Sequence, residues 1–378
     1  MTNLTHVVIV YETEEAARAR LIRYGYSAEL ANEIAVYLGQ ATDLPDFFEE
    51  ITKTLYAEGL MVDFIELDAL LARLPEMMSQ RDSTILWTIT DGIRFYRGSS
   101  ISALSRMAGF ARYGSPVAAQ HICQNKFASL ALAAAAGIPI APTQLIKGSK
   151  LLASLGDWHQ QQGPYFVKPN TLGAKIGIFS DSRCATLEEA LDRTERLWVR
   201  YHDRALIQPF VAGDDVRISF MNVGRGFRAQ LGIEQLAKDP RSETGGEFMT
   251  MKDNETLSGA RDTAGTRGGF GESREAAFVP KMINLRKDGT PRSVAAVDQI
   301  ETLAEKLAGL LELRDYFSID VRIDGAGKPT MFEFEICPGI TIYDFQNYLK
   351  TTHSLSLGAA LAQSLKIAFQ HRWDKQEA

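Results

Sequence analysis

The sequence predicts a protein of mixed α/β and α+β class, built from three consecutive parts. Over residues 1–115, β-branched runs alternate with helix-forming stretches, a pattern typical of a parallel, doubly wound sheet. Residues 116–204 combine helices with a few short strands, which indicates a small α+β domain. Residues 205–378 contain extended segments and one clear hairpin, so we expect an antiparallel sheet there.

Three short runs predict the strands of the first part: HVVIV at 6–10, VDFIEL at 62–67 and STILWTIT at 83–90. Apolar residues at helical spacing predict a helix over 44–59 between the first two strands. The third run ends at Asp91. Ligands of doubly wound sheets collect beyond the carboxyl ends of the strands, so Asp91 is a candidate substrate residue.

The second part carries a lysine at the end of a predicted strand. The stretch YFVKPNTLGAKIGI at 165–178 places Lys168 there, followed by a glycine loop and a second expected strand at 176–180. A lysine held on a strand beside exposed backbone N–H groups is suited to bind phosphate. A simple turn between two strands would explain the glycines but not the lysine. Lys126 opens the preceding alanine-rich helix and is a second candidate.

The hairpin of the third part, YFSIDVRID at 316–324 followed by TMFEFEI at 330–336, carries three acids. Glu333 and Glu335 are two residues apart, so their side chains project from one face of the strand, and Asp320 can reach that face from the other strand. Carboxylates that converge repel one another unless cations neutralise them. A hard divalent ion fits, Mg²⁺ first and Mn²⁺ as the alternative. A solvated outer face of the hairpin would show the same alternation.

Two lysines at element ends, a glycine loop and an acidic hairpin together favour a nucleoside triphosphate bound with Mg²⁺. Another segment, 243–273, is rich in glycine and charge and poor in apolar side chains. A loop of this length in a compact domain is either disordered or functional, so a mobile surface loop and an active-site lid both remain open.

Composition excludes several classes of function. The chain has 378 residues, 45% hydrophobic and 23% charged, with a net charge of −6, so we expect no nucleic-acid partner. The cysteines Cys123, Cys184 and Cys337 are scattered, which suggests a reducing compartment. No apolar run approaches the roughly 20 residues that span a bilayer, and the first residues lack the layout of a signal peptide. We expect a cytoplasmic protein with no membrane partner.

The order of these parts resembles the ATP-grasp superfamily, and within it the D-alanine–D-alanine ligases. The resemblance covers nearly the whole chain and no single motif carries it. The similar segments are NKFASLALAAAAGIPIAPTQLI, YFVKPNTLGAKIGI, LIQPFVAGDD, SIDVRIDGAGKPTMFEFEICPGIT and the closing SLSLGAALAQSL. The resemblance implies an ATP-grasp architecture: an N-terminal parallel α/β domain, a small α+β lid domain and a C-terminal domain with an antiparallel sheet. It also implies a homodimer.

By position, the resemblance implies roles for individual residues. The implied nucleotide contacts are Lys126, Lys168, Gly173, Gln208, Val211 and Asp215, with Gln208 and the Val211 backbone at the adenine and Asp215 at the ribose. The implied metal ligands are Asp320, Glu333 and Glu335. Lys252 matches a phosphate-contacting lysine of the closing loop, which would make 243–273 a lid. The implied reaction phosphorylates a carboxylate with ATP, and an amine then attacks the acyl phosphate.

The departures from the family lie at the substrate end. The serine pair of the glycine loop is Ala174 and Lys175 here, which makes Lys175 a catalytic candidate. The arginine two residues before the metal aspartate, expected to stabilise the oxyanion, is Ser318. We expect Arg217 to replace it, with an ion pair to Asp214 or a neighbouring acid as the alternative.

The candidate substrate residues are also changed. Asp344 stands where the family has a serine that binds a carboxylate, and an aspartate there favours a cationic or neutral amine. Asp91 replaces a histidine, and YETEE replaces the glycine-rich turn after the first strand. Glu12 or Glu14 could hold an ammonium group, or could be ordinary acids at a helix N-terminus.

These departures predict an ATP-dependent carboxylate–amine ligase that acts on small-molecule substrates, an amino-acid (dipeptide) ligase of specialised metabolism. Three alternatives remain open at this point. The first is a D-alanine–D-alanine ligase proper. The second is an ATP-grasp phosphotransferase that releases a stable phosphorylated product. The third is a non-catalytic nucleotide-binding module, which the full set of hairpin acids argues against.

Overall fold

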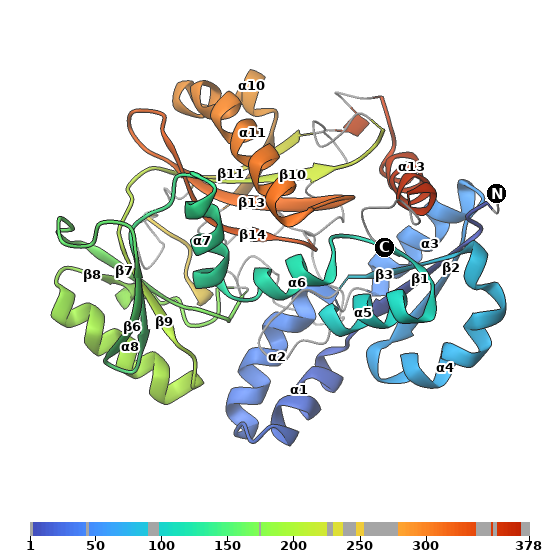
Figure 1. Ribbon diagram of the computed structural model, residues 1–378, viewed down its shortest axis with the longest axis horizontal. Helices are drawn as coiled ribbons and strands as arrows, with labels where there is room; N and C mark the ends of the chain where they lie inside the picture. The colour runs from blue at the N-terminus through green and yellow to red at the C-terminus, as the bar shows by residue number, and fades with distance from the viewer. Residues whose placement is uncertain are drawn as a thin grey trace.

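The strands of the protein form three sheets, one for each part of the chain. The structure is a computed structural model that describes residues 3–42, 45–89, 98–173, 175–224, 230–236, 247–252, 279–337, 349–350 and 354–371. Figure 1 shows the sheet with β1, β2 and β3 at the end that carries the N-terminus. The sheet with β6, β7 and β9 lies at the other end, and the sheet with β10, β11, β13 and β14 lies between them.

The first sheet is parallel throughout, as the alternating pattern predicts. Its strands, in the spatial order β2-β1-β3-β4, are β1 (His6–Tyr11), β2 (Met61–Glu66), β3 (Thr84–Thr88) and β4 (Ala111–Tyr113). Helices α3 (Pro45–Ala57), α4 (Leu70–Met77) and α5 (Gly98–Ala108) connect these strands. The expected helix over 44–59 is therefore confirmed as α3. Both central strands are almost fully buried, which explains why they read as continuous apolar runs.

Two helices between β1 and α3 join the first part to the second (Figure 1). They are α1 (Glu14–Arg23), capped by the Thr13 hydroxyl, and α2 (Ala28–Thr42). Ala17 and Ile34 from this pair belong to the same apolar cluster as Val167 of the second sheet. In addition, Glu33 of α2 accepts a 2.6 Å hydrogen bond from the Tyr201 hydroxyl.

The second sheet is antiparallel and has the order β6-β5-β9-β7-β8. Its strands are β5 (Thr143–Lys147), β6 (Lys150–Leu155), β7 (Tyr165–Pro169), β8 (Arg183–Cys184) and β9 (Ala205–Pro209). Helices α6 (Val117–Cys123), α7 (Lys126–Ala135) and α8 (Leu187–Tyr201) complete this part. Strand β9, which follows residue 204, pairs with β5 and β7 and so belongs to this second sheet.

The strand expected over 176–180 is wrong. Lys175 and Gly177 both have positive φ angles, of 62° and 80°, so the chain turns there and cannot extend. A short 3₁₀ helix, Ser180–Ser182, follows. A Cβ on Gly177 would lie 2.6 Å from the Pro169 ring, so this turn also requires close contact with the end of β7.

The third sheet has the order β12-β11-β10-β13-β14 and is antiparallel, as expected. Its strands are β10 (Asp214–Met221), β11 (Gln230–Leu236), β12 (Val279–Ile283), β13 (Tyr316–Ile323) and β14 (Pro329–Glu335). Helices α10 (Leu285–Asp288) and α11 (Pro291–Leu311) pack on this sheet, and α11 contributes most of the apolar face that covers it. The predicted hairpin is confirmed as β13–β14.

The last helix, α13 (Leu357–Gln370), returns to the first domain and packs against α3 and β4. Beside it, the first and third parts share a buried aromatic cluster. The Trp87 indole donates a 2.7 Å hydrogen bond to the Tyr316 hydroxyl, and the Tyr113 and Tyr316 rings stack with centroids 5.0 Å apart. Across the described ranges, no helix combines the length and the apolar character needed to span a bilayer.

Candidate active site

The three acids of the β13–β14 hairpin converge, as their spacing predicts. Asp320 pairs in register with Glu333, and a β-bulge follows between Asp320 and Val321. One carboxylate oxygen from each of Asp320, Glu333 and Glu335 lies within 4.8 Å of the other two. All three residues are partly exposed, so a ligand can reach them. Three carboxylates at this separation match the oxygen donors that Mg²⁺ or Mn²⁺ prefers.

Arg217 lies on β10 directly opposite Asp320 and bridges two of these acids. Its guanidinium donates to both oxygens of Asp320 (2.8 and 3.0 Å) and to both oxygens of Glu335 (2.8 and 2.9 Å). The alternative of an ion pair with a neighbouring acid is therefore observed, but not with Asp214. That residue instead accepts from Arg292 at 2.7 Å.

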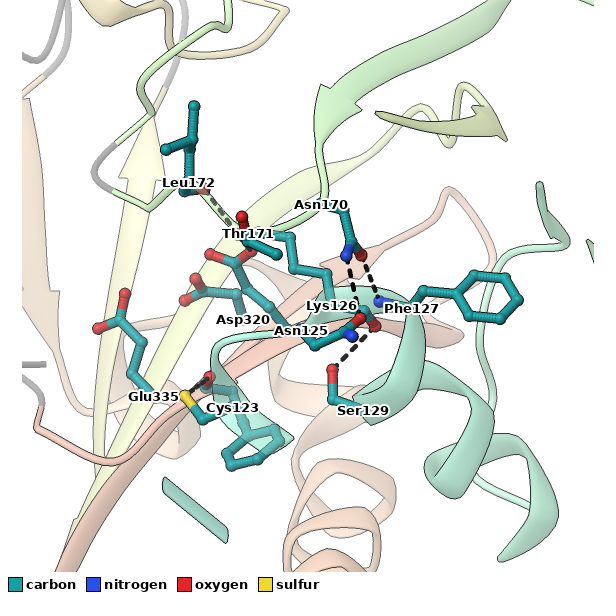
Figure 2. A network of polar contacts seen from close by, with 12 residues as sticks. Cys123, Asn125, Lys126, Phe127, Ser129, Asn170, Thr171, Leu172, Asp320 and Glu335 are labelled. Carbon is teal, nitrogen blue, oxygen red and sulfur yellow. Dashed lines mark hydrogen bonds and ion pairs between the residues drawn. The ribbon is translucent and has the colours of Figure 1, made fainter. Parts of the chain in front are cut away.

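Lys126 reaches the third acid from the other side of the site. It is the first residue of α7, whose N-terminus is capped by the Asn125 side chain. The Lys126 ammonium donates to the Leu172 carbonyl (2.8 Å) and lies 3.5 Å from a carboxylate oxygen of Glu333. Figure 2 shows Lys126 extending toward Leu172, with the hairpin acids Asp320 and Glu335 beside it.

Lys168 lies at the same place, on β7, and is only 6% exposed. Burial lowers the pKa of Lys168 from 10.5 to about 8, although the negative charge of Glu333 opposes this shift. Burial alone would raise the pKa of Glu333, but Lys126, Lys168, Lys175 and Arg217 outweigh it and hold that pKa well below its usual value. The lysines and the acids predicted from separate motifs thus act on one another in the folded chain.

The glycine loop after β7 is anchored at its base by residues that the sequence analysis did not identify. The Asn170 amide group accepts from the Phe127 backbone N–H (2.9 Å) and donates to the Asn125 side chain (3.0 Å) (Figure 2). Next to it, the Thr171 backbone and hydroxyl both donate to Asp203, at 2.7 and 2.9 Å. The sequence feature that could have indicated this anchor is the position of Asn170 directly after Lys168 and Pro169.

The predicted glycine-loop residues follow this anchor. Gly173 accepts a 2.9 Å hydrogen bond from the backbone of Ile176 in the turn that Lys175 begins. The positive charge of Lys175 lowers the pKa values of both Lys168 and Glu333.

On β9, just before the hinge, the Gln208 side chain is fully buried. Its amide nitrogen donates to the Thr143 hydroxyl at 2.8 Å, and within the described part of the chain its Oε1 has no hydrogen-bond partner. Such a buried acceptor needs a donor, and one is expected from a ligand at this position.

Arg322 organises the rest of the hinge and was missed by the sequence analysis. It donates to both oxygens of Asp215 (2.5 and 3.1 Å), to the Val211 carbonyl (2.6 Å) and to the Glu247 carbonyl (2.6 Å). Its guanidinium also lies 4.8 Å from the centre of the Phe210 ring. The sequence did contain an indication of this role. Arg322 is two residues after Asp320 on β13, so the two side chains share a face of the strand, and Arg322 pairs in register with Asp215.

Among the described residues, the predicted acids Glu12 and Glu14 lie at or just before the start of α1. Glu12 forms a buried ion pair with Arg20 of α1, with two 2.7 Å hydrogen bonds, and Glu14 lies in the first turn of that helix. Lys252 is exposed at the end of the segment 247–252, which is tied to the glycine loop by a 2.8 Å bond from the Met251 N–H to the Ile178 carbonyl. The candidates Asp91 and Asp344, and the remainder of loop 243–273, lie outside the described residues.

Known proteins resemble this chain in sequence and in fold. No protein-family model matches the chain. The D-alanine–D-alanine ligase of Citrifermentans bemidjiense is 24% identical over 268 residues, 71% of this chain and 73% of that protein. The ligase of Gloeobacter violaceus is 22% identical over 269 residues, covering 71% of this chain and 76% of that protein.

Solved structures match over almost the whole length. The D-alanine–D-alanine ligase from Bacillus anthracis complexed with ATP has a TM-score of 0.63 at 14% identity, covering 99% of this chain and 100% of that one. The enzyme from Coxiella burnetii has a TM-score of 0.56 at 14% identity over 99% of this chain and 97% of that one. The fold is the ATP-grasp fold of the D-alanine–D-alanine ligases. The predicted ATP-grasp architecture and the resemblance to these ligases are both confirmed.

Proposed function

We propose that this chain is an ATP-dependent ligase that joins a carboxylate to an amine through an acyl phosphate. The observation that carries the proposal is the 3.5 Å approach of the Lys126 ammonium to the Glu333 carboxylate. It brings Lys126 to the acids of the hairpin, and the charges of Glu333 and Lys126 also act on the buried Lys168. A triphosphate with its divalent cation needs both kinds of group at one place. The relatives named above are D-alanine–D-alanine ligases, which supports the same class of reaction.

The triphosphate end of the site would be held by charge. Lys126 and Lys168 would contact the phosphates, with Gly173 and Lys175 in the loop above them. Asp320, Glu333 and Glu335 would hold Mg²⁺, which would supply Lewis-acid stabilisation of the charge on the transferring phosphoryl group. The positive charges of the lysines support this assignment, because they lower the pKa of Glu333 and keep its carboxylate ionised, as a metal ligand must be.

The adenosine end would be held at the hinge. The unpartnered Oε1 of Gln208 would accept from the exocyclic amine of adenine, beside the backbone N–H of Val211. Asp215 would accept from the ribose hydroxyls through the lone pairs that Arg322 does not use. The Bacillus anthracis ligase, which has the same fold over its full length, is complexed with ATP, and this supports a nucleotide site in the fold.

The acid and the amine are expected to be amino acids, because the relatives are named as ligases of D-alanine. We propose a product other than D-alanyl-D-alanine. Ser318, which stands where the family has its oxyanion arginine, is fully buried and cannot supply a cation. Arg217 lies beside the acids and is the group that we assign to the oxyanion. Lys252 would close the site from the 247–252 segment. A cytoplasmic homodimer remains our expectation.

The proposal can be tested by a phosphate-release screen with Mg²⁺ and ATP over D- and L-amino acids and simple amines, tested singly and in pairs. Ligation requires two substrates, and hydroxylamine should trap the acyl phosphate of the acid as a hydroxamate. Lys168→Met should abolish both signals. Release with one substrate and a stable phosphorylated product would identify a phosphotransferase instead. If D-alanyl-D-alanine forms as fast as every other product, the proposed substrate class is wrong and the ligase class stands.

A further inference from the structure

Arg217 occupies the carboxylates that the proposed cation would need. Its three guanidinium nitrogens make four hydrogen bonds of 2.8–3.0 Å, which engage both oxygens of Asp320 and both oxygens of Glu335. Glu333 is left out of this arrangement and faces Lys126 instead. The acid cluster is therefore divided between an arginine-bound pair and one lysine-facing member.

These contacts are strong enough to matter energetically. The side chains of Arg217, Asp320 and Glu335 are only 22–27% exposed, so solvent screens their charges incompletely. Bidentate bonds between a guanidinium and a carboxylate are among the stronger hydrogen bonds in proteins, and without Arg217 the two acids would repel each other. Arg217 thus lowers the free energy of the acid pair in the absence of a metal.

A divalent cation and Arg217 compete for the same two carboxylates. The guanidinium binds all four of their oxygens. A divalent cation at the same carboxylates would place two further positive charges beside that of Arg217. A cation that arrives alone must therefore displace or approach Arg217 at an electrostatic cost. A cation that arrives with a triphosphate brings compensating negative charge, and the same phosphates offer Arg217 a new partner.

Resting on the proposed function, we infer that Arg217 is an exchangeable counter-ion for Asp320 and Glu335. It holds the two acids together while no cation is bound, and it passes to the anionic reacting group when the cation and nucleotide bind together. Arg217 thereby makes cation binding depend on nucleotide. Its exchange would prevent the acid cluster from loading with metal before ATP is present.

The test measures Mn²⁺ binding to the nucleotide-free full-length protein, by the electron paramagnetic resonance signal of free Mn²⁺. Arg217→Met should bind Mn²⁺ at least about tenfold more tightly than the wild type, because the competing charge is gone. Arg217→Lys keeps the positive charge but loses the planar guanidinium, so its Kd for Mn²⁺ should lie between those of the wild type and Arg217→Met. Arg292→Met is the matched control: it removes a guanidinium paired with Asp214 near β10, outside the acid cluster, and should leave the Kd unchanged. Equal or weaker binding by Arg217→Met overturns the inference.

A second measurement applies if Arg217→Met does not fold. In wild-type protein with ¹⁵N-labelled arginine, the side-chain N–H resonance missing from Arg217→Lys should shift when Mg²⁺ and ATP are added together. Mg²⁺ alone at the same concentration should shift it much less. A resonance that does not move overturns the inference. Failure of the wild type to bind Mn²⁺ even with ATP would instead contradict the proposed function, which separates the two outcomes.

Discussion

The ammonium nitrogen of Lys126 lies 3.5 Å from a carboxylate oxygen of Glu333, which joins the second and third parts of the chain. Lys126 opens α7 and Glu333 lies on β14, two elements that pack against each other. Neither residue type is unusual alone. The proposed nucleotide site depends on their approach, and substitution of either residue tests it.

Removing either lysine should weaken nucleotide binding. A hydrogen bond to a charged group contributes about 1.5–3 kcal/mol, so Lys126→Met and Lys168→Met should each raise the Kd for ATP with Mg²⁺ by roughly tenfold to a hundredfold. The measurement is isothermal titration calorimetry. Lys150→Met, at an exposed position on β6, is the control and should bind as the wild type does. Unchanged affinity in both lysine variants would contradict the site.

Removing the Glu333 charge should reduce turnover more than nucleotide binding. Glu333→Gln keeps the shape of the side chain but loses one of the expected metal ligands. Lewis-acid stabilisation by a bound metal contributes several kcal/mol, so kcat should fall by about a hundredfold or more and the Mg²⁺ concentration for half-maximal rate should rise. Glu188→Gln on the exposed face of α8 should change neither quantity. A kcat equal to that of the wild type would exclude Glu333 as a ligand.

Nucleotide affinity should fall above about pH 8. Burial lowers the pKa of Lys168 to about 8, and only its protonated form attracts phosphate. ATP binding must therefore take up a proton above that pH, and the Kd should rise by up to about tenfold per pH unit. Lys168 should have the opposite effect on folding. Its contribution to the free energy of unfolding should rise between pH 8 and 10.5, because the unfolded chain binds more protons there. Calorimetry from pH 7 to 10 checks the trend, and Lys168→Met should lose it.

Arg322 should matter for adenosine binding and not for the chemical step. Arg322→Met removes the donors that hold Asp215 and the Val211 carbonyl, so the KM for ATP should rise about tenfold or more at a nearly unchanged kcat. Arg322→Lys should recover only part of the affinity, because lysine lacks the planar fork. Arg286→Met, in an exposed ion pair of α10, is the control. A large fall in kcat with an unchanged KM would show that Arg322 acts elsewhere.

The buried aromatic contact between the first and third parts should contribute to stability. Tyr316→Phe leaves the Trp87 indole N–H without its acceptor, which costs about 1–3 kcal/mol in a fully buried position. Urea unfolding followed by circular dichroism measures this difference. Tyr56→Phe, at a side chain that is 73% exposed, should change the free energy of unfolding by much less. If the two variants unfold alike, the Trp87–Tyr316 bond is not a stabilising one.

Local pattern predicted the features that depend on neighbouring residues. The parallel first sheet follows from apolar runs that alternate with helix-forming stretches. The helix α3 and the β13–β14 hairpin follow from periods of 3.6 and two residues, and all three features were found. The strand over 176–180 was wrong because two positive φ angles, at Lys175 and Gly177, override its apolar composition. The pairing of β9 with the second sheet could not be predicted, because it joins residues distant in sequence.

The candidate site divides in the same way. The identities of Lys168, Glu333 and Glu335, and the sharing of one strand face by the two acids, follow from the order of residues alone, because side-chain direction alternates along any strand. Partners across strands and domains follow only from folding. The pairing of β10 with β13 brings Arg217 to two acids, and folding pairs Glu12 with Arg20. The interaction between two charged side chains depends on their distance in space, and the packing of the whole chain sets that distance.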